Sequence, residues 1–170
     1  MGWRTSITVA NAARAGARVG SSLGISNQAD YSALLAVAAG IQSSSGRVSI
    51  NKVIIFESTS ASGAVPSACL SLAPGTTYTG STASSCNVYS GTWITALVAG
   101  GSATAFTSTA TSTCTSGGGT RPDRWWCPAN RNNVQLSTGG LDYFGVYVET
   151  THSTFTKMLG TSFTIKQTSV

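Results

Sequence analysis

The stretch "ANAARAGARVG" (residues 10–20) consists mainly of small side chains and contains no proline. Because alanine has the highest helix propensity, residues 3–20 are predicted to form a helix that ends at Gly20. Ala12, Gly16 and Gly20 recur every four residues and therefore share one face of this helix. A row of small residues lets another backbone approach closely, so this face is predicted to pack tightly against a helix or a sheet.

Working outward from this helix, the next two segments predict a second helix and a strand. The second helix covers residues 31–41, with Asp30 as its N-cap. Residues 47–57 are rich in β-branched side chains, and their apolar alternation changes register near Asn51–Lys52, which predicts a strand with a bulge. A further short helix is predicted over residues 90–98, ahead of a glycine pair.

The end of the chain predicts two strands, over residues 141–152 and 161–170, that pair antiparallel. Helices therefore come first and most strands afterwards. The predicted fold class is α+β: one domain over residues 1–170, in which the Ala-rich N-terminal helix and the second helix pack on a small antiparallel sheet. The sheet side of the core is predicted to contain Phe144, Val146, Val148, Phe163 and Ile165.

Two long loops, predicted over residues 58–86 and 102–133, contain the four cysteines. An even number of cysteines in Ser-, Thr- and Gly-rich loops indicates two disulfides that pin the loops, and hence an oxidising compartment. Of the three possible connectivities we favour Cys69–Cys86 with Cys114–Cys127, because each bridge closes a short local loop. Four buried free thiols in a cytosolic protein are the alternative.

The charge and the absence of a targeting segment limit the function classes. The net charge is +5, from ten Lys and Arg against five Asp and Glu. The basic residues are scattered rather than clustered on one helix, so a nucleic-acid partner is not expected. No signal peptide or apolar run of about 18 residues occurs, although the cysteines indicate export. We therefore expect the chain to be a fragment whose targeting or membrane segment lies upstream.

Four stretches, taken in order, carry a resemblance to a known family. They are "VANAARAGARVGSSLG" (9–24), "ADYSALLAVAAGI" (29–41), "WWCPANR" (125–131) and "DYFGVYVETTHSTFTKMLGTSFTIKQTSV" (142–170). Together they resemble the TadE-like proteins of actinobacterial type, which are minor pilins or pseudopilins of tight-adherence (Flp-type) pilus systems. The last stretch is the most telling, because it joins an Asp-Tyr-x-Gly-Val-x-Val strand, a His-containing connection and a final alternating strand.

The resemblance implies a pilin-like fold and a structural role. Residues 1–20 would be the lower part of a helix that enters the membrane or the pilus core. The rest would be a soluble ectodomain on the extracellular face of a bacterial membrane, at the cell surface. Its partners would be other pilus or envelope proteins, reached through the N-terminal helix, and the membrane, reached through the missing segment. The expected function is pilus assembly or adhesion without catalysis or cofactor.

The residues themselves do not favour an enzyme. His152 is the only histidine, and no G-x-S-x-G motif accompanies it, so we interpret it as a structural residue that caps a turn. No pair stands out among the five acidic residues, and no cysteine pair has the spacing of a zinc site. We therefore expect no catalytic residue and no metal site.

The segment "TRPDRWWCPANR" (120–131) offers an alternative function. Cations and aromatic faces meet there, as they do in glycan sites. The possible ligand patch consists of Arg121, Arg124, Trp125 and Trp126. The interpretation we prefer is packing, with tryptophan in the core beside Cys127 and Asp123 paired to a neighbouring arginine. If the patch does bind a surface glycan, the chain is a secreted glycan-binding module.

Overall fold

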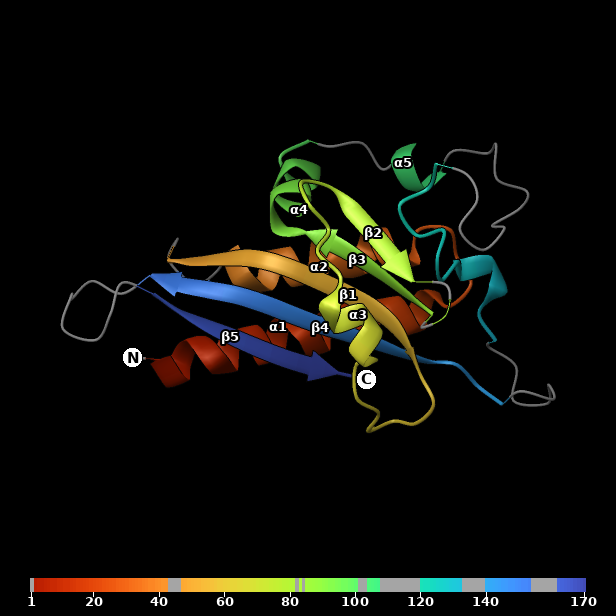
Figure 1. Cartoon of the computed structure of the whole chain (residues 1–170), viewed down its shortest axis with the longest axis horizontal. Coiled ribbons are helices and arrows are strands. Elements are labelled where there is room, and N and C mark those ends of the chain that lie inside the picture. Colours follow the sequence, from red (N-terminus) through yellow and green to blue (C-terminus); the bar gives the residue numbers. More distant parts are fainter. Residues whose placement is uncertain are drawn as a thin grey trace.

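Five antiparallel strands form one sheet, in the order β2-β3-β1-β4-β5, in the computed structural model of the chain (Figure 1). The strands are β1 (Val48–Ser58), β2 (Tyr78–Ser81), β3 (Cys86–Ser90), β4 (Tyr143–Ser153) and β5 (Ser162–Ser169). The structure describes residues 2–42, 47–81, 83, 85–100, 104–107, 120–132, 140–153 and 162–170.

The two long helices cover one face of this sheet. Figure 1 shows α1 and α2 side by side behind the strands and the short α3 in front. The helical segments are α1 (Gly2–Leu23), α2 (Ala29–Gln42), α3 (Ser67–Ser71), α4 (Gly91–Val98), α5 (Thr104–Thr107) and the 3₁₀ turn η1 (Pro128–Asn130). The predicted α+β class, with two helices packed on an antiparallel sheet, is confirmed.

The small residues of α1 bring it against both α2 and the sheet. A Cβ added at Gly16 would lie 2.6 Å from Val37 Cγ2 on α2, and one added at Gly20 would overlap the ring of Phe144 on β4. Ala12 occupies the same row and meets Gly40 of α2, where an added Cβ would lie 2.9 Å from Ala12 Cβ. The predicted close packing of this face is therefore seen within the domain, on a helix and on a sheet together.

The predicted end of the first helix is wrong by three residues. α1 continues past Gly20 to Leu23, and Gly24 then takes a φ of 51°, a left-handed conformation that favours glycine. The Gly24 N–H donates to the Gly20 carbonyl at 3.0 Å and closes the last turn. Gly20 thus serves the contact with Phe144, not the helix end.

Most of the predicted sheet core is confirmed, with one exception. Phe144, Val146, Val148 and Ile165 are buried against the helices, in one cluster with the inner residues of α1 and α2. The prediction that Phe163 lies in the core is wrong: its side chain is 37% exposed and stacks on His152, with ring centroids 4.9 Å apart. It lies near the start of an edge strand, where no further strand covers its outer side among the described residues.

The β2–β3 hairpin lies where the sequence predicted a loop and the start of a helix. β2 is only four residues long, and all five residues of β3 are buried, so neither shows the alternation that reveals a strand. β3 pairs with the middle of β1 and extends the sheet, whose second face is buried by α3 and its neighbours. The predicted bulge in β1 is confirmed as a register shift between Ile50 and Lys52.

Candidate functional site beneath the loop of residues 120–132

Asp30 lies at the centre of a buried polar network. Its predicted role as an N-cap is wrong, because α2 begins at Ala29 and the Asp30 carboxylate points into the core instead. The carboxylate accepts hydrogen bonds from the Asn87 amide at 2.9 Å, the Tyr89 hydroxyl at 2.7 Å and Arg131 Nη2 at 2.5 Å. One acid of α2 thereby joins the sheet to the loop of residues 120–132.

Asn87 fixes the same loop from β3. Its side-chain oxygen accepts from the backbone N–H groups of Trp125 at 3.2 Å and Trp126 at 3.0 Å. Its amide nitrogen donates to the Trp126 carbonyl at 2.9 Å, and Arg131 Nη2 donates to that carbonyl as well, also at 2.9 Å. The backbone of an irregular segment therefore gains the hydrogen-bond partners that a strand would otherwise supply.

A second buried ion pair closes the other end of the loop. Arg121 Nε and Nη2 donate to the two carboxylate oxygens of Asp123 at 2.7 and 2.6 Å. Arg121 Nη2 also donates to the Asn27 carbonyl between α1 and α2, at 3.1 Å. The predicted pairing of Asp123 with a neighbouring arginine is confirmed.

Burial and ion pairing shift the pKa values of three groups in this network. Burial raises the pKa of Asp123, while its hydrogen bond from Arg121 opposes that rise. The hydrogen bond to Asp123 raises the pKa of Arg121. Burial, and then the negative charges of Asp30 and Asp123, raise the pKa of Tyr89 well above its ordinary value, so its hydroxyl stays protonated and donates to Asp30.

The two tryptophans occupy different environments. Trp126 is only 5% exposed and packs against Phe144 and under the guanidinium of Arg131, which lies 4.1 Å from the indole centroid. Trp125 is half-buried: it covers β2 at Gly80, where an added Cβ would lie 2.5 Å from its ring. Both positions agree with the packing interpretation.

The four predicted patch residues do not form one exposed surface. Arg121 and Trp126 are buried with protein partners. The Arg124 guanidinium lies 3.8 Å from the centroid of Trp125, so these two half-buried side chains cover each other. Glycan binding at this patch stays a prediction, and Arg124 and Trp125 are the members that reach the surface.

A hollow of about 300 Å³ adjoins the network at Arg131. Two of the Arg131 nitrogens, Nε and Nη1, are buried and have no hydrogen-bond partner among the described residues. Aromatic and apolar side chains form much of the remaining wall, including Trp126, Leu141, Tyr143 and Phe144.

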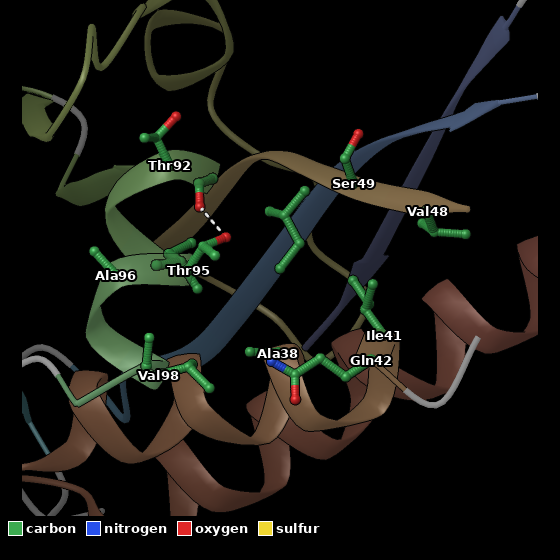
Figure 2. Close-up of a pocket in the computed structure, with 13 residues that line it drawn as sticks. Ala38, Ile41, Gln42, Val48, Ser49, Thr92, Thr95, Ala96 and Val98 are labelled. Atoms are coloured by element: carbon green, nitrogen blue, oxygen red, sulfur yellow. Dashed lines mark hydrogen bonds between the residues drawn. The ribbon is translucent and has the colours of Figure 1, made fainter. Parts of the chain in front are cut away.

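A larger, uncharged groove of about 710 Å³ lies at the other end of α2 (Figure 2). Its walls come from three elements: Ile41 and Gln42 of α2, Val48 and Ser49 of β1, and α4. Figure 2 shows the side chains of Thr95 and Val98 on the α4 wall. Thr95 Oγ1 donates to the Gly91 carbonyl at 2.9 Å, so this hydroxyl is already engaged within α4.

The disulfide prediction is confirmed where the structure describes it. Cys69 and Cys86 are bonded, with Cα atoms 6.4 Å apart, and join α3 to β3. Cys127 is disulfide-bonded as well, whereas Cys114, its predicted partner, lies outside the described residues. No free cysteine occurs in the part of the chain that the structure describes, so the alternative of four free thiols is wrong.

His152 stands apart from the acidic residues of the network. It stacks on Phe163, and its Nδ1 is buried without a hydrogen-bond partner among the described residues. Within the described ranges, no group of three or more His, Cys, Asp or Glu side chains is placed to hold a metal ion. The helices within those ranges include none that is both long enough and apolar enough to cross a membrane.

The chain matches no protein-family model, no curated protein and no solved structure. The resemblance to TadE-like proteins therefore rests on the four stretches quoted above.

Proposed function

We propose that the chain is the ectodomain of a TadE-like minor pilin, a structural and assembly component of a cell-surface pilus or envelope secretion apparatus. The observation that carries the proposal is the two-sided construction of α1. One side uses Ala12 and Gly16 to seat the helix on its own domain. The opposite side exposes Trp3, Ile7 and Arg14, a mixed surface that can contact a neighbouring protein.

The disulfides support the proposed location at the bacterial cell surface. The Cys69–Cys86 bridge and the bonded state of Cys127 are typical of proteins that fold in an oxidising compartment. The proposed partners are accordingly other pilus or envelope proteins.

The buried network supports a structural rather than a catalytic role. The Asp30 carboxylate accepts from Asn87, and Arg121 donates to Asp123 and to the Asn27 carbonyl, so these charges are engaged inside the protein. Together with the Arg131–Asp30 pair, they hold an irregular loop of 13 residues (120–132) against α2 and β3. A rigid loop of this kind suits a subunit that presents a fixed surface.

A complementation experiment in the source bacterium tests the proposal. Cells that lack the gene are complemented with the native gene, with Ile7→Glu on α1, or with Leu70→Glu on α3 as the control. Ile7 is 48% and Leu70 40% exposed, so both variants are expected to fold. We expect Ile7→Glu to lose the protein from the sheared surface-filament fraction, while Leu70→Glu retains it.

Two outcomes contradict the proposal. One is an unchanged filament fraction in the gene deletion with the native protein free in the medium. The other is retention of the purified domain on a glycan array that Trp125→Ala abolishes without unfolding, which supports the glycan-binding module instead.

A further inference from the structure

β5 is a long edge of the sheet with little protection against pairing. Its eight residues pair with β4 without a register shift, and no strand covers its other side among the described residues. Proteins usually protect such an edge with prolines, bulges, charged side chains such as lysine, or a covering segment. β5 has no proline and no bulge, and Lys166 is its only charged residue. The other edge, β2, is four residues long and is covered by Trp125 at Gly80.

The first half of α1 lies beside β5 and exposes two apolar side chains. Gln167 Nε2 of β5 donates to Ser6 Oγ of α1 at 3.0 Å, which places the first turns of the helix beside this strand. Trp3 and Ile7 lie four residues apart and are 66% and 48% exposed. Phe163 is exposed at the same end of β5, opposite His152 in the β4 register.

The second half of α1 forms a basic border along the same strand. Arg14 continues the stripe of Trp3 and Ile7, seven residues after Ile7, and Arg18 follows one turn later. Both arginines are exposed and line a hollow together with Ser169 and Val170 at the end of β5. Neither has an acidic partner in the described part of the chain.

We infer that the free edge of β5 binds an extended, acidic segment of a partner protein by strand addition. The backbone of the segment would pair with β5, as peptides do when they extend a sheet. All neighbouring strands here are antiparallel, so the N-terminal half of the segment would lie beside Arg14 and Arg18 and carry the acidic residues. Its C-terminal half would cover Trp3 and Ile7 and carry apolar residues.

A second copy of this chain fits the edge less well. A two-fold axis at β5 would place the Trp3 end of one copy against the Arg18 end of the other. The second β5 would bring Lys166 and no carboxylate to the arginines, which would remain without anions. Charge complementarity therefore selects an acidic partner segment. This inference goes beyond the proposed function and does not depend on it, because the edge and its borders are present whatever assembly the domain joins.

Titration calorimetry with a peptide as long as β5 tests the inference. The probe is the peptide Asp-Glu-Thr-Val-Thr-Val-Thr-Val, and the control is a peptide of the same residues in reverse order. We expect the forward peptide to bind about tenfold more tightly, since only it brings carboxylates to the arginines while its apolar half covers the tryptophan. Arg14→Gln with Arg18→Gln should remove most of that preference. The control variant Thr92→Glu with Ala96→Glu changes the net charge equally on exposed positions of α4 and should leave binding unchanged.

Backbone methylation separates strand addition from simple charge attraction. In an antiparallel pair, alternate residues of the peptide turn their N–H groups towards β5. N-methylation of one alternate set should therefore abolish binding, while methylation of the other set should not. Hydrogen exchange should slow at backbone amides of β5 when the unmethylated forward peptide is bound.

Three results would overturn the inference: no binding of the forward peptide, equal binding of the forward and reversed peptides, or equal binding of the two methylated peptides. Failure of the filament experiment would leave all three peptide results unaffected, so the two proposals fail separately.

Discussion

Removal of the Asp30 charge should destabilise the domain strongly, although the change from Asp30 to Asn alters hardly any volume. The carboxylate serves three donors, from Asn87, Tyr89 and Arg131. In Asp30→Asn the Arg131 cation, whose side chain is 4% exposed, would lose its buried counter-ion. One new N–H donor would also face groups that already donate.

The expected magnitude follows from the burial of both partners. Removal of one member of a buried ion pair costs about 3–5 kcal/mol, because the remaining charge stays away from water without compensation. The same cost applies to Arg131→Met, which leaves Asp30 charged. In the double variant neither charge remains, and the loss should reduce to about 2–4 kcal/mol, mostly from donors left without an acceptor. The coupling between the two sites should then be at least about 2 kcal/mol.

Urea unfolding with the disulfides intact measures these differences. Tryptophan fluorescence is a suitable signal, since Trp126 packs under the Arg131 guanidinium. The control is Arg14→Met, which removes an exposed arginine of α1 and should change the free energy of unfolding by less than about 0.5 kcal/mol. Additive losses in the double variant, or a loss under about 1 kcal/mol in Asp30→Asn, would refute the reasoning.

Three further predictions concern packing, cross-links and pH. Overlap with Phe144 should cost Gly20→Ala about 1–3 kcal/mol, which offsets or exceeds the roughly 1 kcal/mol gained in helix propensity, and a raised Tm would contradict this. Serine at both positions of the Cys69–Cys86 bridge, 17 residues apart, should cost about 3 kcal/mol in urea unfolding, and unchanged stability would argue against the bridge as a stabilising element. Because the pKa of Tyr89 is raised in the folded chain, its hydroxyl should stabilise the fold fully below pH about 10. Above that pH the contribution should be lost progressively, because Tyr89 of the unfolded chain loses its proton first. Tyr89→Phe should therefore show a smaller fall in the urea midpoint above pH about 10 than the native chain, and an equal or steeper fall would contradict the shift.

The predictions that succeeded came from patterns local in the chain. The small-residue row of α1, the bulge at Ile50–Lys52 and the helix after Ser90 can each be recognised within a dozen residues. The Cys69–Cys86 bridge was found in the same way, because it closes a short loop. The β2–β3 hairpin was not predicted, because β2 is short and β3 is buried along its whole length, so neither strand shows an alternating pattern.

The sequence by itself determined the α+β class, the two-helix layer and the oxidised cysteines, because periodicity and spacing encode them locally. Only the tertiary structure decided what Asp30 does. The local sequence is the same whether Asp30 caps α2 or binds Asn87, and Asn87 lies 57 residues away. The same holds for Asn87, whose side-chain oxygen accepts from the Trp126 backbone N–H 39 residues away. These polar groups pair because each would lose free energy if it were buried without a partner. Their partners are distant in the sequence, so no local pattern reveals the pairing.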